Sequence, residues 1–252
     1  MALLAVFLFA GQAEAAVVTA EGKTVSKNIE IQNDTAYIPL RELLAHCGSW
    51  SVFWDSDTRS ATADGPAFSL TFPIGANHIL LNGAAYQTPG SYLKDAVTYV
   101  PLRAAAQLCG YDVIWQGTGQ PILLSSNQTD YSEEDLYWLS RIISAESRGE
   151  SLLGQLAVGT VVLNRVKNEA FPDTIEGVIL DEKNGTQFEP VSNGTVYDVP
   201  AESSLLAARL CLEGTRVAGE SLYFYAPALS QGLWIKENRP YLTTIGCHRF
   251  FL

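Results

Sequence analysis

A repeat with a period of 62 residues constrains the first half of this chain more than any other feature. Residues 37–41 read Y-I-P-L-R, and residues 99–103 read Y-V-P-L-R. A Cys-Gly pair follows each motif at the same distance, as Cys47-Gly48 and Cys109-Gly110, and each copy then runs into a short apolar stretch that ends in tryptophan. Two copies in register predict one structural unit used twice, with a core that is completed when the copies pack together.

Each copy is predicted to form a strand, a short helix, a glycine stop and a second strand. The proline of each motif suits the first helical turn, where its missing N–H has no partner to lose, and the glycine suits the position after the helix end. Between the copies, residues 68–72 alternate apolar and polar side chains like a half-buried strand. Asn82-Gly83 is a hairpin signal. We therefore expect residues 17–125 to form a small two-repeat α+β domain.

The paired Y-x-P-L-R…G…W units resemble the copper amine oxidase N-terminal-like domain of secreted bacterial proteins, over roughly residues 20–125. The resemblance implies an accessory module without catalysis. Its name does not imply copper here, because His46, His78 and His248 are far apart in sequence and form no metal-ligand motif. We expect neither a metal site nor a cofactor.

Acidic residues outnumber basic ones 27 to 16, which gives a net charge of −11. Such a chain is poorly suited to grip nucleic acid through phosphates or to bind an anionic membrane surface. With 47% hydrophobic and 17% charged residues, packed domains are expected. No apolar run reaches the roughly 18 residues that a membrane-spanning helix needs.

The start of the chain predicts export. Residues 3–11 are apolar and Ala13-Glu14-Ala15 supplies small residues for cleavage, so residues 1–16 are predicted to be a signal peptide of an extracytoplasmic protein. Export permits disulfides. The four cysteines allow three complete pairings, and buried free thiols are equally compatible with the spacing. Residues 126–130 are polar and are predicted to be a linker to a second domain, 131–252.

The second half begins with a helix that carries one unusual carboxyl group. Ser132 is a suitable N-cap with three acidic residues behind it, and Leu139, Ile143 and Glu146 share one helix face before Gly149 ends the helix. A carboxyl group at the end of an apolar stripe, near the negative end of the helix dipole, is hard to ionise, so its pKa should rise. A glycosidase general acid needs this property. An ion pair with an arginine such as Arg165 is the alternative, which the spacing alone favours.

Further helices are expected over residues 151–167, 174–180 and 200–213, and strands over 221–225 and 241–245. Aromatic rings can stack on sugars, and those in loops or at strand ends are the better candidates. These are Phe188, Tyr225 and Trp234. Glu150 lies beyond the helix stop and is expected to be solvated or to cap the next helix.

The stretch S-R-I-I-S-A-E-S-R-G-E at residues 140–150 resembles the helix and turn that open the SleB-type cell-wall hydrolase domain, and the similarity continues in order over nearly all of residues 133–252. The family is associated with lysis of spore cortex and peptidoglycan. The resemblance implies a mainly helical, lysozyme-like domain with a short β-hairpin, and Glu146 as the catalytic acid. It implies contacts to peptidoglycan glycan strands from Glu150, Gln187, Phe188, Tyr225 and Trp234. Ala226 departs from the family, which often has asparagine there.

The reaction type depends on the number of carboxyl groups. A lytic transglycosylase needs one, whereas a muramidase or glucosaminidase that hydrolyses the glycan needs a second one about 5–9.5 Å away. Glu150, Glu189 and Glu220 are the candidates for the second group, and the sequence does not rank them. We expect a lytic transglycosylase. A hydrolytic enzyme and a wall-binding protein without catalysis are the alternatives, and the oligomeric state is left open.

Overall fold

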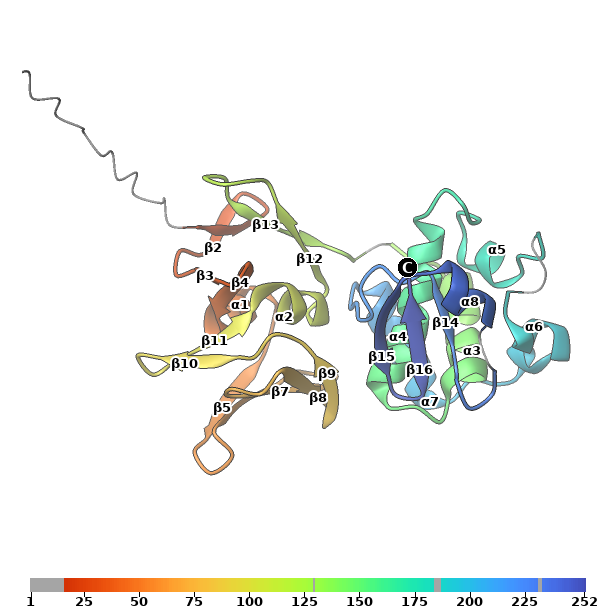
Figure 1. The fold of residues 1–252 in the computed structure, drawn as a ribbon, viewed down its shortest axis with the longest axis horizontal. Coiled ribbons are helices and arrows are strands. Elements are labelled where there is room, and N and C mark those ends of the chain that lie inside the picture. Colours follow the sequence, from red (N-terminus) through yellow and green to blue (C-terminus); the bar gives the residue numbers. More distant parts are fainter. Residues whose placement is uncertain (1–15, 129, 184–186, 231–232) are drawn as a thin grey trace, which may run out of the picture.

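The computed structural model describes residues 16–128, 130–183, 187–230 and 233–252, and shows a strand-rich first part and a mainly helical second part (Figure 1). The predicted signal peptide lies outside the described residues, apart from its last residue. Among the described residues, every helix is too short or too polar to traverse a membrane.

The first part contains three antiparallel or mixed sheets and two short helices. Its first repeat holds β1 (Val18–Ala20), β2 (Lys23–Ser26), β3 (Glu30–Gln32), β4 (Thr35–Pro39), α1 (Leu40–His46), β5 (Ser51–Asp55) and β6 (Ser60–Asp64). After β7 (Ser69–Pro73), the second repeat holds β8 (His78–Leu81), β9 (Ala84–Gln87), β10 (Tyr92–Lys94), β11 (Val97–Pro101), α2 (Leu102–Leu108), β12 (Tyr111–Trp115) and β13 (Ile122–Ser126). The sheet orders are β12-β13-β1-β2, β10-β11-β4-β3 and β5-β6-β7-β8-β9.

The two repeats are related by an approximate two-fold axis through the middle sheet. β4 and β11 pair antiparallel with Ile38 opposite Val100, which are equivalent positions of the repeat. β3 and β10 then lie at the two outer edges of that sheet, again as equivalents. In the first sheet, the β1-β2 pair joins the β12-β13 pair of the other repeat through β1 and β13. In the third sheet, β5-β6 and β8-β9 flank β7, which has no equivalent in the other repeat. The 62-residue period therefore describes the arrangement of strands and helices in the whole first part.

The local signals work largely as predicted. The turn after β8 has positive φ at Asn82 (47°) and Gly83 (83°), as a type I′ hairpin requires. Gly48 and Gly110 follow the helices with φ of 113° and 87°. The position of the prolines differs from the prediction by one residue. Pro39 and Pro101 are the N-cap residues of α1 and α2 and do not lie in the first helical turn.

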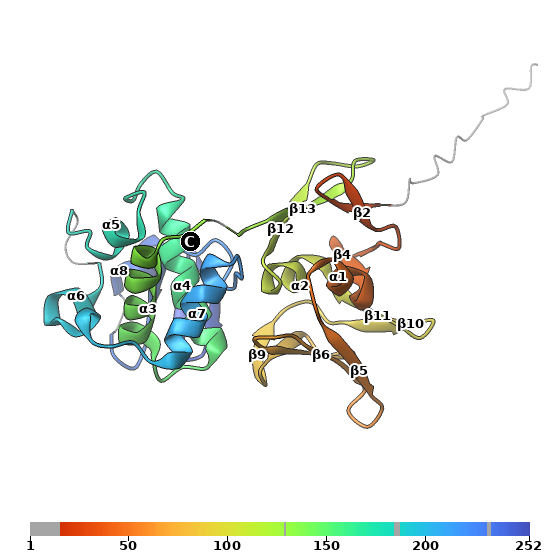
Figure 2. The same ribbon diagram turned by 180° about the vertical axis from the view of Figure 1, so that it is seen from behind.

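The second part surrounds one buried helix. Its elements are α3 (Glu133–Ser147), α4 (Leu152–Val166), α5 (Ile175–Ile179), α6 (Glu189–Asn193), η1 (Thr195–Tyr197), α7 (Glu202–Leu212), β14 (Tyr223–Tyr225), α8 (Leu233–Asn238), β15 (Tyr241–Ile245) and β16 (His248–Phe251). Residues 153–163 of α4 are all buried, so every face of this helix is covered by other elements. α3 and α7 pack on α4 (Figure 2).

The second part contains a short hairpin, as expected, formed by β15 and β16, and β14 adds a third strand to give the sheet order β14-β16-β15. β15 and β16 are joined by Gly246 and Cys247, and Gly246 has a φ of 57°. Glycine at the first of two loop residues is the signature of a type II′ turn, which the sequence analysis overlooked. Phe250 on β16 is fully buried, while Arg249 and Phe251 belong to the opposite face of the strand.

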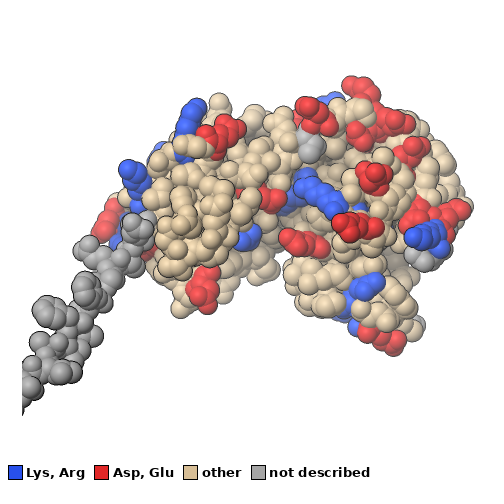
Figure 3. All heavy atoms as spheres, turned by 90° about the horizontal axis from the view of Figure 1, so that it is seen from above, with Lys and Arg blue, Asp and Glu red and all other residues tan. Residues whose placement is uncertain are grey.

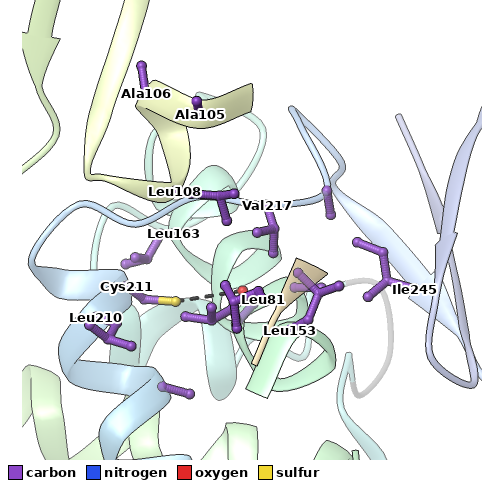
Figure 4. Close-up of a cluster of buried hydrophobic side chains, with 14 of the residues drawn as sticks. Leu81, Ala105, Ala106, Leu108, Leu153, Leu163, Leu210, Cys211, Val217 and Ile245 are labelled. Carbon is purple, nitrogen blue, oxygen red and sulfur yellow. Dashed lines mark hydrogen bonds between the residues drawn. The ribbon is translucent and has the colours of Figure 1, made fainter. Parts of the chain in front are cut away.

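The two parts share buried apolar residues. One cluster contains Leu81 and Leu108 from the first part with Leu163, Cys211 and Val217 from the second (Figure 4). Backbone bonds add to this contact, because Arg216 N donates to Gln107 O at 3.0 Å and Asn127 N donates to Gly110 O at 2.9 Å. Asn127, within the predicted linker, is only 7% exposed. The segment between the parts is thus held against α2.

Candidate active site

Glu146 lies on the last turn of α3, on the side that faces the core. The helix begins at a capping box, in which Asp135 N donates to Ser132 Oγ at 3.1 Å and Ser132 N donates to Asp135 Oδ2 at 2.9 Å. Leu139 and Ile143, on the same face as Glu146, are fully buried. The pKa of Glu146 is raised to about 7, mainly by burial and also by the negative charge of Glu189, while the positive charge of Arg165 opposes the rise. The raised pKa expected from the sequence is confirmed.

Arg165 is a fixed positive charge beside Glu146, held by aromatic rings. Its guanidinium carbon lies 5.0 Å from the ring centre of Phe171, 5.1 Å from that of Phe188 and 5.6 Å from that of Tyr223. Nε donates to the Leu222 carbonyl at 2.8 Å. Burial lowers the pKa of Arg165 to about 10, so the group stays charged at neutral pH. None of the ion pairs formed by the described residues joins Arg165 to Glu146, so the alternative ion pair is not present.

Two of the aromatic candidates are inside the protein, contrary to our expectation. Phe188 is 2% exposed because its ring covers the Arg165 guanidinium and packs 6.3 Å from Phe224. Tyr225 is 6% exposed because it stacks on Phe251 at 5.8 Å. Their rings support the site from within and offer no open face to a sugar.

Trp234 is the exposed aromatic side chain of the set, with 56% of its surface accessible. It lies on α8, where the sequence analysis expected a loop, and packs edge-on against Tyr223 with ring centres 6.1 Å apart. Tyr223 was overlooked, although the alternation of β14 places it on the same face as Tyr225. Gln187 is half-buried directly before Phe188. The structure thus brings Glu146, Arg165, Phe188, Tyr223 and Trp234 into one connected group.

Glu150 occupies a structural position: it is neither solvated nor the cap of the next helix, because the N-cap of α4 is Ser151, so both parts of the expectation are wrong. Its side chain is 14% exposed, and both carboxylate oxygens accept from Cys247 N at 3.3 Å. A Cβ on Gly246 would lie 1.9 Å from Glu150 Oε2, so a larger residue would displace this carboxylate, and the φ of 57° also favours glycine at this point of the β15–β16 turn. A role for Glu150 in substrate binding stays a prediction.

The three candidates for a second carboxylate lie in different surroundings. Glu189 is the exposed first residue of α6, and its charge reaches Glu146. Glu150 holds the turn just described. Glu220 lines a cavity of about 1060 Å³ between the two parts of the molecule, away from Glu146. Within the described part of the chain, no group of three or more His, Cys, Asp or Glu side chains could hold a metal ion.

The second part is thus a mainly helical domain with one protonatable carboxyl group beside a fixed cation and an aromatic wall, the arrangement of a carboxyl-dependent glycan-cleaving protein. Comparison with known proteins agrees. The Cell Wall Hydrolase family model matches residues 149–251, starting three residues after Glu146, and the Copper amine oxidase N-terminal domain model matches residues 19–124. The chain belongs to the cell wall hydrolase family.

Individual relatives are similar over less than half of the chain. The spore cortex-lytic enzyme of Bacillus cereus is 37% identical over 120 residues, which are 48% of this chain and 45% of that enzyme. The cell wall hydrolase CwlJ of Oceanobacillus iheyensis is 32% identical over 38% of this chain and 72% of that protein. The solved catalytic domain of the germination-specific lytic transglycosylase SleB from Bacillus anthracis is 35% identical over 49% of this chain and 98% of that domain, with a TM-score of 0.45. The chain spans less than half the length of the cortex-lytic enzymes that it matches.

Proposed function

We propose that this protein is an extracytoplasmic lytic transglycosylase that cleaves the glycan strands of peptidoglycan in spore cortex or cell wall. The observation that carries the proposal is the carboxyl group of Glu146, whose burial raises its pKa to about 7. A substantial fraction of the group is then protonated at neutral pH, as a general acid must be. The names of the relatives, spore cortex-lytic enzyme and lytic transglycosylase, support the choice of substrate.

The reaction needs Glu146 first as an acid and then as a base. Its carboxyl group donates a proton to the glycosidic oxygen while the bond from that oxygen to the anomeric carbon breaks. The resulting carboxylate accepts the proton of the same sugar's 6-hydroxyl as that oxygen attacks the anomeric carbon. A 1,6-anhydro ring forms, no water is consumed, and Glu146 ends protonated again.

Arg165 suits the middle of this sequence. Between the two proton transfers Glu146 is an anion, and a nearby cation stabilises that state. The three aromatic rings and the bond to the Leu222 carbonyl fix the guanidinium in place, so little reorganisation is needed when the negative charge appears. Because Arg165 does not form an ion pair with Glu146, it limits the rise in the pKa of the carboxyl group but does not prevent its protonation.

Hydrolysis is the alternative that one observation favours, because Glu189 is close enough to act electrostatically on Glu146. Mass spectrometry of the fragments that the full chain releases from peptidoglycan sacculi separates the two reactions. Fragments that end in 1,6-anhydro sugars are expected. Fragments with reducing ends would instead identify a hydrolase, with Glu189 as the first candidate for its second carboxylate. Absence of any release would leave a wall-binding protein.

Glu146→Gln tests the assignment of the acid directly. Glutamine keeps the shape and hydrogen-bonding capacity but donates no comparable proton, and general acid catalysis contributes about 10²–10⁴ in rate. We expect the rate of fragment release to fall by at least that range while the protein still binds sacculi. Glu150→Gln is the matched control, because the same chemical change falls on the carboxylate that holds the Cys247 turn. Turnover near the wild-type level in a folded Glu146→Gln protein contradicts the assignment.

A further inference from the structure

A cationic cavity lies on the outer face of the small sheet of the second part. It has a volume of about 440 Å³ and is lined by Lys236, Arg239, Tyr241, Thr244, Arg249 and Phe251. Three of these six side chains are cations and none is acidic. In a chain with 27 acidic and 16 basic residues, such a lining is a strong local departure. Figure 3 shows the more usual pattern, with acidic side chains spread over one face of the second part and a few basic ones between them.

The three cations have aromatic and hydroxyl neighbours. Arg239 lies 4.5 Å from the Tyr223 ring centre and donates to the Tyr223 hydroxyl at 2.9 Å, while its Nε is buried without a hydrogen-bond partner. Lys236 Nζ lies 5.4 Å from the Tyr225 ring centre. None of the ion pairs among the described residues involves Lys236, Arg239 or Arg249. Like charges gathered around one cavity repel each other, and an anion bound between them relieves that cost.

The cavity is connected to the catalytic group through a single tyrosine. The ring of Tyr223 lies next to both Arg239 at the cavity and Arg165 beside Glu146. The lining also offers the Tyr241 and Thr244 hydroxyls, which are 2.9 Å apart. Tyr223 therefore links the cavity to the surroundings of Glu146.

We propose that this cavity binds a carboxylate of the stem peptides that branch from the glycan strand. This inference rests on the proposed function, because it takes peptidoglycan as the substrate and assigns its peptide part a site. Arg and Lys side chains are the usual partners of carboxylates, through charge-assisted hydrogen bonds. Phosphate-rich wall polymers are the less suitable anion, because a protein with a net charge of −11 repels a polyanion at long range.

The test measures binding of the full chain to sacculi by co-sedimentation, with Glu146→Gln in every protein so that the sacculi stay intact. The test variant adds Lys236→Gln and Arg249→Gln, both at exposed side chains. The matched control adds Lys167→Gln and Arg209→Gln, which remove the same charge from exposed positions outside the cavity. We expect about tenfold weaker binding for the cavity variant and less than a twofold change for the control.

Chemical treatment of the sacculi identifies the anion. Amidation of their carboxyl groups should weaken binding of the protein with an intact cavity about tenfold and remove the difference between the two variants. It should also remove most of the salt dependence of binding, a readout that needs no cavity variant. Equal losses in cavity and control variants overturn the proposal, as does a difference that persists on amidated sacculi. If hydrofluoric acid, which strips phosphate polymers, removes the difference instead, the stem-peptide assignment is wrong. Because the assay uses no turnover, a failure of the proposed reaction shows separately, as absent fragment release by the wild-type chain.

Discussion

At the scale of single residues, the site depends on a carboxyl group that the fold makes expensive to ionise. Glu146 continues the face of Leu139 and Ile143 toward the end of α3, so the residues that build the core also desolvate the acid. Arg165 compensates only in part, because its guanidinium is shared among three aromatic rings. The free energy that burial costs the ionised form is the reason why the group is still partly protonated at neutral pH.

The raised pKa predicts two opposite trends with rising pH. The activity of the wild-type protein should fall, whereas the stability gained through Glu146→Gln should grow. In the folded protein the pKa of Glu146 is about 7, above its ordinary value of 4.5. As pH rises between these values, the unfolded chain loses the proton first, and the free energy of unfolding therefore falls. The ionised group costs at most about 3 kcal/mol above pH 7. We expect Glu146→Gln to melt several degrees above wild type at pH 8 and at nearly the same temperature at pH 4.5. Wild-type kcat/KM should fall as pH rises through about 7.

Calorimetry of both proteins across this pH range checks the sign, because other titrating groups are common to the two. An ion pair between Glu146 and Arg165 would reverse the trend. The wild-type protein would then be the more stable one at pH 8, and the variant would lose stability together with activity.

At the scale of secondary structure elements, the sequence predicts best where the signals are local. The 62-residue repeat, the Asn82-Gly83 hairpin and the boundaries of α3 and α4 all follow from turn residues and caps. α6, α8 and β16 were not predicted. The first two have five and six residues, too few to show a helical period, and α6 lacks the capping side chain that Thr174 provides for the equally short α5. β16 is recognised only through the glycine turn that precedes it. The surroundings of Arg165 and Glu150 could not be predicted either, because both depend on contacts with residues more than 20 positions away.

The two-fold relation of the repeats selects one cysteine pair. Cys47 and Cys109 are the equivalent residues that cap α1 and α2, and the thiol of Cys47 lies near enough to that of Cys109 to raise its pKa. The rings of the neighbouring His46 and Tyr111 lie 5.1 Å apart, which confirms that the two helix ends meet. We expect oxidation by glutathione disulfide to form a disulfide bond between Cys47 and Cys109. Each bond formed reduces one glutathione disulfide to two glutathione thiols. Closing a loop of roughly 60 residues should stabilise the folded protein by up to about 4 kcal/mol and so raise its melting temperature.

Peptide mass spectrometry without reduction identifies the bond. Dithiothreitol should reverse the gain in melting temperature, and Cys109→Ala should prevent it. The exposed Cys247 serves as the control, since Cys247→Ser should leave the bond and its effect unchanged. Oxidation that yields mainly bonds to Cys247 or Cys211, or no intramolecular bond, contradicts this pairing.

At the scale of the whole molecule, the two parts are joined by more than a linker. Leu108 and Val217 belong to one buried cluster, and the segment 213–216 is bonded to the end of α2. We predict that residues 131–252 fold and act alone, with the boundary within residues 125–131, but with a lower melting temperature than the full chain because this contact is lost. Limited proteolysis and calorimetry of the two proteins test this. A first cut elsewhere without a stable C-terminal fragment, or equal melting temperatures, disagrees with it.

The repeat supplies a matched pair of glycines that isolates the contact between the parts. Gly48 and Gly110 are equivalent and both have positive φ, so alanine costs each of them about 1 kcal/mol of backbone strain. At Gly48 a Cβ meets nothing within 4 Å, whereas at Gly110 it lies 3.1 Å from the Glu213 carbonyl of the second part. We expect Gly110→Ala to melt a few degrees below Gly48→Ala, because only there must the two parts move apart. In a fragment of residues 17–125 that folds, the difference should disappear. Equal melting temperatures in the full chain would mean that the approach of α2 to residues 213–214 adds nothing to its stability.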